Sequence, residues 1–259
     1  MEKQVHFKNH LGEKLTGTLH QPGKPSDGGI IIGHCFTCSR HTRVLQQMGR
    51  ELAAARFTVL RFDFSGNGQS EGAFIDSSYA KHIAEMKTAA AFLSANSGVR
   101  WIGLAGHSTG GNIALLAGAR LKSVRAFCLL ASRISGMKAT HFLSTAQQTE
   151  IERSGRVFFT SRGRSLEISK DFFADAGNYD MLKVIGSLKR PLLVIHGDRD
   201  EIVPMDEALQ AHKLNPAAIT LKVIPGADHM FSQEDHRSQV AEVVADWFTR
   251  QLHKKHDKA

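Results

Sequence analysis

Short apolar runs alternate with helix-like segments along most of this chain, and that alternation restricts the possible folds more than any other feature. Consecutive positions, rather than alternate ones, are apolar in the runs at residues 29–33, 57–62, 101–105, 124–130, 192–195 and 219–224. Such runs are typical of strands that are buried on both faces, and the helical patterns between them would cover those faces. We therefore predict an α/β protein with a mainly parallel, doubly wound sheet.

Two segments depart from this alternation. Residues 5–19 contain two short β-like runs around the turn-like segment 9–13, which predicts an antiparallel hairpin at the N-terminal end of the sheet. Between residues 133 and 188 the chain is polar and rich in Ser, Thr and Arg. Because a structureless loop of that length is uncommon, we expect a mostly helical cap there. The core would then consist of residues 1–132 and 189–259.

Composition excludes several classes of protein. Of the 259 residues, 42% are hydrophobic and 22% are charged, which is typical of a globular chain rather than a disordered one. No run approaches the ~18 apolar residues of a membrane helix, and the first residues lack the apolar centre of a signal peptide. The net charge is +8, but there are only two Trp and two Tyr and no nucleic-acid-binding motif. We expect a cytoplasmic protein without a nucleic-acid partner and without a membrane span.

The pattern Gly-x-Ser-x-Gly marks candidate nucleophiles, and it occurs twice. Ser108, in the Gly-His-Ser-Thr-Gly segment 106–110, directly follows a buried strand and directly precedes a helix built from small residues. Glycines on both sides of the serine allow the backbones to approach at a tight strand-to-helix turn. Ser70 lies instead in the polar loop 65–72, with no helix beginning beside it. We predict Ser108 as the nucleophile. Three neighbours would form its turn: Gly106, His107 and Gly110.

A serine hydroxyl needs a base, and the base needs an acid that orients it. When the serine occupies such a turn, the order along the chain is Ser, Asp, His. His229 is the downstream histidine that lies in a glycine-containing loop directly after a strand, so we predict it as the base. The loop after the preceding strand holds both Asp198 and Asp200, and an aspartate there can also brace the turn. The residues alone do not decide which of these two aspartates orients the histidine.

Acyl transfer also needs N–H donors for the oxyanion that forms on the substrate. One donor would be the backbone N–H of Thr109, the residue after the nucleophile. The other should come from the loop that follows the first parallel strand, residues 33–38.

Taken together, these motifs resemble the α/β-hydrolase superfamily, and the resemblance is closest to its capped feruloyl-esterase-like and serine-aminopeptidase-like group. It rests on His34-Cys35-Phe36 and on the segments 62–70, 106–110, 196–204 and 226–229. The resemblance implies that the N–H of Phe36 is the second oxyanion donor, and that Asp200, as the Asp of Gly-x-x-Asp, is the acid. It also implies a serine esterase that works through an acyl-enzyme and requires no metal and no cofactor.

One departure from that group concerns the cysteines. Cys35 stands where the group has the glycine of His-Gly-Phe, and residues 34–38 resemble the hydrolase domain that is found fused to an OsmC-like domain. A separate OsmC-like partner is therefore one partner that the resemblance allows. A disulfide between Cys35 and Cys38 would close a very short loop and strain it, so we expect both thiols to be free. A thioredoxin-like redox pair, or a metal site that adds His34 and His41, are the other interpretations.

Three functional hypotheses follow from these residues. The first is a serine esterase that acts on small acyl or aryl esters. The second keeps the same triad but changes the bond, to a thioester or a peptide, although the basic insertion weakens the case for an aminopeptidase. The third is a redox-linked or non-catalytic module that uses the cysteine pair. The sequence leaves the acyl and alcohol groups open, and also the oligomeric state, a homodimer included.

Overall fold

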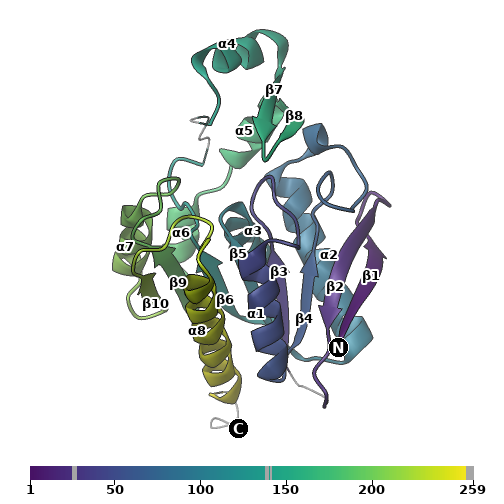
Figure 1. The fold of residues 1–259 in the computed structure, drawn as a ribbon, viewed down its shortest axis with the longest axis vertical. Helices are drawn as coiled ribbons and strands as arrows, with labels where there is room; N and C mark the ends of the chain where they lie inside the picture. The colour runs from purple at the N-terminus through teal and green to yellow at the C-terminus, as the bar shows by residue number, and fades with distance from the viewer. Residues whose placement is uncertain (25–27, 138–139, 141, 255–259) are drawn as a thin grey trace.

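The computed structural model describes residues 1–24, 28–137, 140 and 142–254, and its centre is one eight-stranded sheet (Figure 1). Its strands are β1 (Glu2–Lys8), β2 (Lys14–His20), β3 (Gly28–Gly33), β4 (Thr58–Phe62), β5 (Trp101–His107), β6 (Val124–Leu130), β9 (Leu192–Gly197) and β10 (Ile219–Ile224). Their spatial order is β1-β2-β4-β3-β5-β6-β9-β10. From β4 to β10 every neighbouring pair is parallel, whereas β1–β2 and β2–β4 are antiparallel. The predicted mainly parallel sheet with an N-terminal hairpin is confirmed.

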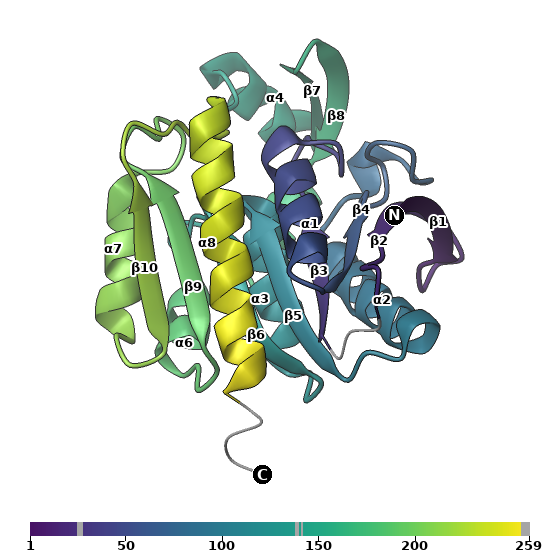
Figure 2. The same cartoon turned by 60° about the horizontal axis from the view of Figure 1, so that its bottom comes forward.

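Helices cover both faces of the sheet, which explains why its strands are apolar at consecutive positions. On one face α1 (Arg43–Ala54) packs beside α8 (Glu234–His253), as Figure 2 shows. On the other face lie α2 (Tyr79–Ser97), α3 (Thr109–Gly118), α6 (Met181–Gly186) and α7 (Met205–Leu214). Along β3 the alternation is visible, because Ile30 and Ile32 belong to the first of these cores and Ile31 to the second. No helix among the described residues is long and apolar enough to cross a bilayer.

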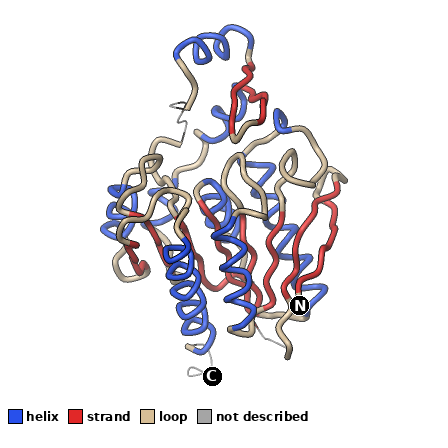
Figure 3. The backbone as a smooth tube through the Cα atoms, in the orientation of Figure 1, coloured by secondary structure: helices blue, strands red, loops and turns tan. Residues whose placement is uncertain are grey.

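A smaller unit, the cap, lies over the carboxyl ends of the strands (Figure 3). Along the chain it is inserted between β6 and β9. It contains α4 (Thr145–Ser154), β7 (Arg156–Ser161), β8 (Arg164–Ser169) and α5 (Lys170–Ala176), and a short 3₁₀ turn, η1 (Phe74–Asp76), packs against β8. The sequence predicted a mostly helical segment and did not reveal the β7–β8 hairpin. Residues 138, 139 and 141 of the segment lie outside the described residues. Helix α6 packs against α7 and α3 and so belongs to the core layer rather than to the cap.

The parallel arrangement gathers the chemically interesting loops at one edge. Strands β3, β5, β9 and β10 all run toward the cap, so the loops after Gly33, His107, Gly197 and Ile224 open toward the same space. Ligands of open α/β sheets bind at this carboxyl edge.

Candidate active site

Ser108 is the single residue between β5 and α3, and its backbone is unusual. Its φ of 53° and ψ of −123° lie in a region that residues with a Cβ rarely adopt. The surrounding structure holds this conformation, because the Ser108 N–H donates to the carbonyl of Leu130 at 2.7 Å and the Ser108 carbonyl accepts from the Ser132 hydroxyl at 2.9 Å. The side chain is thereby presented at the carboxyl edge of the sheet.

The glycines of this turn are required by the closeness of the backbones around it. A Cβ added at Gly106 would lie 2.2 Å from the carbonyl of Gly110. A Cβ at Gly110 would lie 2.4 Å from the carbonyl oxygen of His34, in the loop after β3. Both neighbours are backbone atoms rather than flexible side-chain ends. An added methyl group would therefore fit only if the backbone of the strand or of the helix moved.

We expect Gly106→Ala to lower the free energy of unfolding by about 1–3 kcal/mol or more, because the added methyl group overlaps backbone that cannot rotate away. Gly186→Ala, at the exposed end of α6, is the matched control, since a Cβ there meets nothing within 4 Å and alanine favours helix. Urea denaturation of both variants measures the difference. Equal stabilities for the two variants would contradict this account of the turn.

His229 and Asp200 form a buried pair in the loops after β10 and β9. The Nδ1–H of His229 donates to Oδ2 of Asp200 at 2.8 Å, and the Asp200 side chain is fully buried. Its other oxygen, Oδ1, accepts from the N–H groups of Ile202 at 2.9 Å and Val203 at 2.8 Å. Burial alone would raise the pKa of Asp200, but the hydrogen bonds from His229, Val203 and Ile202 outweigh it and lower that pKa below its usual value. An ionised acid therefore faces the imidazole.

Asp198, the other acid that the sequence left open, has a different contact. Its Oδ1 accepts from the N–H of Gly226 at 2.6 Å, which ties the two loops together, and the residue is exposed. The structure therefore brings Asp200, rather than Asp198, against His229. The hydrogen bonds that His229 makes run to Asp200 and to His107; among the described residues, none reaches the Ser108 hydroxyl. Free enzymes often close that contact only when substrate is bound.

Two buried histidines support this pair, through contacts that the sequence does not indicate. The Nε2–H of His107 donates to the carbonyl of His229 at 2.8 Å. Burial, together with the charge of His229, lowers the pKa of His107 to about 3, so its ring stays neutral. His196, in β9, donates from Nε2 to the carbonyl of Val203 at 2.8 Å and lies 3.4 Å from Oδ2 of Asp200. The position of His196, directly before the Gly-x-x-Asp segment, is the only sequence signal for it.

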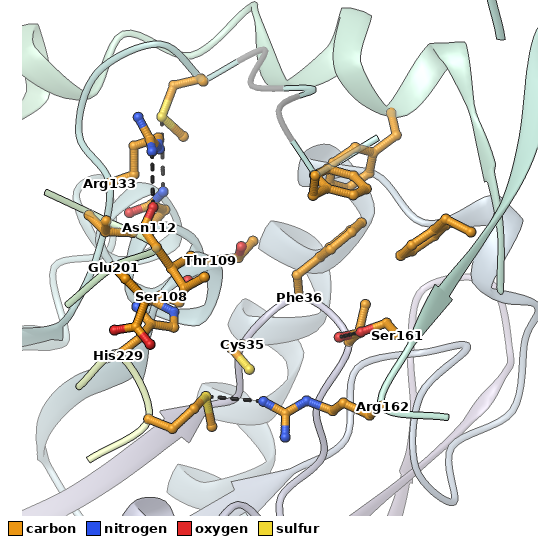
Figure 4. A pocket seen from close by; sticks show the side chains of 18 of the residues that line it. Cys35, Phe36, Ser108, Thr109, Asn112, Arg133, Ser161, Arg162, Glu201 and His229 are labelled. Carbon is orange, nitrogen blue, oxygen red and sulfur yellow. Dashed lines mark hydrogen bonds between the residues drawn. The ribbon is translucent and has the colours of Figure 1, made fainter. Parts of the chain in front are cut away.

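The loop after β3 supplies the second predicted oxyanion donor. His34 fixes this loop, because its Nδ1–H donates to the carbonyl of Cys35 at 2.7 Å while its Nε2 accepts from the N–H of Phe64 at 3.0 Å. Within the described chain the N–H of Phe36 meets no acceptor. The N–H of Thr109 is the first of helix α3 and has no intrahelical partner either. Both residues line the same cavity as Ser108 (Figure 4).

The same loop corrects the expectation of free thiols, because Cys35 and Cys38 are joined by a disulfide. The Cys38 N–H donates to the carbonyl of Cys35 at 3.1 Å, and this turn brings the two Cα atoms to 5.2 Å, within the usual range for disulfides. Short sequence separation therefore does not prevent the bond when the chain turns at that point. The metal interpretation fails with it, since sulfurs bonded to each other cannot act as thiolate ligands.

A cavity of about 510 Å³ connects the core loops with the cap. On its core side Ser108, His229 and Glu201 lie close together in Figure 4, with Arg133 and Asn112 above them. On its other side four phenylalanines, Phe36 among them, form an aromatic wall, and the ring centroids of Phe36 and Phe172 are 4.8 Å apart. The wall consists of Phe36, Phe142, Phe159 and Phe172. Three of these four residues come from the cap segment, which therefore covers the site.

Two protein-family models and several solved structures resemble this chain. A family model described as serine aminopeptidase, S33, matches residues 25–172, and one described as the dienelactone hydrolase family matches residues 172–254. The esterase domain of a Rhodothermus marinus protein is 26% identical, with a TM-score of 0.76 over 96% of this chain and 98% of that chain. Est1E from Butyrivibrio proteoclasticus, solved with ferulic acid bound, is 23% identical, with a TM-score of 0.79 over 96% of this chain and 99% of that chain.

Curated relatives match over shorter stretches. The mitochondrial palmitoyl-protein thioesterase ABHD10 of Rattus norvegicus is 30% identical over 156 residues, which are 58% of this chain and 51% of that protein. A putative phosphoribosyl transferase of Mycobacterium tuberculosis is 37% identical over 68 residues, which are 26% of this chain and 15% of that protein. The chain thus spans about half the length of the first of these relatives and about a seventh of the second.

Proposed function

Since this chain belongs to the serine aminopeptidase S33 family of α/β-fold hydrolases, we propose that it is a serine hydrolase that cleaves carboxylic esters through an acyl-enzyme. One observation carries the proposal. A buried, ionised Asp200 orients His229 in the cavity that also holds Ser108 on its strained turn. This is the arrangement that converts a serine hydroxyl into a nucleophile.

The proposed reaction assigns one task to each group. Because Nδ1 of His229 donates to Asp200, Nε2 is the basic nitrogen and takes the proton of Ser108 as its oxygen attacks the substrate carbonyl. The N–H groups of Phe36 and Thr109 bind the oxyanion that forms. His229 then returns the proton to the leaving alcohol, which departs and leaves an ester on Ser108. A water molecule, deprotonated by His229, attacks that ester, releases the acid and restores Ser108.

Esters are favoured over peptides by what surrounds Ser108. An aminopeptidase must hold a substrate ammonium group with a carboxylate that has no competing cation. Here the acids of the cavity, Glu201 and Asp228, are accompanied in its lining by Arg133 and Arg162. The aromatic wall suits an apolar or aromatic acyl group instead. Thioesters are the second candidate, because the rat relative that is 30% identical over part of the chain is a palmitoyl-protein thioesterase.

A substrate panel tests the proposal directly. The panel comprises p-nitrophenyl esters of graded acyl length, a feruloyl ester, an acyl-CoA and an aminoacyl anilide, each assayed with the wild-type protein. We expect turnover of the esters and none of the anilide. Turnover of the anilide alone would contradict the ester assignment, and turnover of the acyl-CoA alone would replace it with the thioester.

We further propose that the cap selects the acyl group, and neighbouring residues of β7 allow a matched test. Phe159 is buried in the aromatic wall, whereas Phe158 is 62% exposed on the opposite face of the strand. Phe159→Leu is expected to change the ratio of kcat/KM between a bulky aryl ester and an acetyl ester by on the order of tenfold, because a contact made only with the larger acyl group is lost. Phe158→Leu should leave that ratio unchanged. If Phe159→Leu and Phe158→Leu gave the same ratio, the proposal that the cap selects the acyl group would be wrong.

A further inference from the structure

A second hollow lies next to the catalytic cavity, and arginines from three separate elements line it. It has a volume of about 310 Å³, and Arg162 and Met230 line both spaces. Arg43 comes from the start of α1, Arg162 from the β7–β8 turn and Arg237 from the first turns of α8. Figure 4 shows Arg162 below Cys35, and a dashed line marks its contact with the Met230 sulfur. Arg162 and Met230, the residue after His229, therefore form the boundary that the hollow shares with the catalytic cavity.

The charges of these arginines are not neutralised by acids of the chain. Among the described residues, none of the three has a carboxylate within ion-pair distance. Arg162 donates to the Met230 sulfur at 3.0 Å, which is a weak acceptor, and Arg237 donates to backbone carbonyls. On the outside of the cap, by contrast, Arg153 pairs with Glu150 and Arg156 with Glu167. Three uncompensated cations around one concave space raise its local affinity for anions.

The position of His229 decides which part of a substrate would reach this hollow. In the proposed reaction His229 gives its proton to the leaving group, so the leaving group must lie beside the imidazole. The acyl group has the aromatic wall on the other side of Ser108, around Phe36. A group that extends from the leaving alcohol past Met230 therefore enters the arginine-lined hollow.

We propose that this hollow binds a phosphate on the leaving-group side of the substrate, so that the preferred substrates are phosphorylated esters; the proposal rests on the ester hydrolase function above. Arginine guanidinium groups match the geometry of phosphate oxygens with paired N–H donors, and the hydroxyl of Ser232 lies in the same lining. Asp228, two residues before Met230, uses Oδ1 to accept the N–H of Ser232 at 2.7 Å and lines the catalytic cavity rather than the hollow.

Three esters with one acyl group and one three-carbon leaving group test the proposal: 3-hydroxypropyl butyrate, 3-(phosphonooxy)propyl butyrate and 2-carboxyethyl butyrate. We expect the wild type to have a kcat/KM for the phosphate ester at least about tenfold above that for the neutral ester. The advantage should shrink as ionic strength rises, because exposed arginines are screened. A carboxylate ester that equals the phosphate ester would overturn the assignment to phosphate, and equal values for all three would overturn the site.

Matched variants show whether the hollow is responsible. In the double variant Arg43→Gln/Arg237→Gln the ratio of the phosphate ester to the neutral ester should fall toward one. Arg153→Gln/Arg156→Gln removes the same charge from the outside of the cap and should keep the wild-type ratio. A ratio that falls equally in both double variants would show an effect of net charge and would overturn the proposal.

A binding measurement separates this proposal from the proposed function. Calorimetric titration of Ser108→Ala with the phosphate ester and with the neutral ester reports affinity without turnover. Tighter binding of the phosphate ester, lost in Ser108→Ala combined with Arg43→Gln/Arg237→Gln, supports the hollow even if wild-type protein hydrolyses none of the three esters. Wild-type hydrolysis with equal affinities for both esters supports the hydrolase and overturns the phosphate site.

Discussion

Ser108→Ala is expected to lower kcat for ester hydrolysis by roughly three to six powers of ten, because the proposed acyl-enzyme forms on the Ser108 hydroxyl. The same variant should lose labelling by a fluorophosphonate probe, which reacts with an activated serine. Both losses should occur without unfolding, since the strained turn is held by backbone contacts and not by the Ser108 hydroxyl. Steady-state rates and gel-based labelling measure the two effects.

Ser70→Ala is the matched control, because Ser70 lies in the other Gly-x-Ser-x-Gly segment. Its hydroxyl donates to the carbonyl of Asp63 at 2.6 Å and accepts from the N–H of Thr16 at 2.9 Å, so it braces a loop. We expect normal labelling and nearly normal turnover in this variant. Labelling that persists in Ser108→Ala would end the serine hydrolase proposal.

Asp200→Asn is expected to lower kcat by about four powers of ten, and the hydrogen bonds of Asp200 explain why. Oδ1 accepts two backbone N–H groups, so the amide oxygen of an asparagine would take that place. Its NH₂ group would then face Nδ1 of His229 and donate to it. The imidazole would then carry its proton on Nε2, and a protonated Nε2 cannot accept the proton of Ser108.

Asp198→Asn provides the comparison at the other acid of the loop. An asparagine oxygen can still accept the N–H of Gly226, so this variant should lose little activity. Near-ultraviolet circular dichroism of both variants establishes that each is folded. If Asp198→Asn were the more damaging of the two, the acid would be assigned to the wrong residue.

The fold and the members of the candidate triad were accessible from sequence because local signals agree there. Continuous apolar runs require burial on both faces, and that requirement alone predicts the parallel sheet and its helical layers. Ser108 was separable from Ser70 because a strand precedes it and a helix follows it. The choice of Asp200 over Asp198 needed a family resemblance, since both lie in one loop and only their backbone positions distinguish them.

Other features depend on relations that a sequence does not display. The β7–β8 hairpin has the period-two pattern of Val157 and Phe159 inward and Phe158 outward, but the pattern covers too few residues to stand out in a polar segment. The disulfide depends on the turn from Cys35 to Cys38, and the thiol spacing alone is equally compatible with a free pair. The arginine-lined hollow joins residues from three elements that are distant along the chain.

The directions in which β1 and α8 run have a practical consequence for attaching this protein to a solid support. Strand β1 starts at the edge of the sheet away from the cap, because it is antiparallel to β2, which is antiparallel to β4. Helix α8 ends at that same edge, far from α4 and β7 (Figure 1). A bead or electrode attached through either of these elements would therefore face the base of the molecule. The cavity between the core loops and the cap would lie at the opposite edge of the sheet, away from the support.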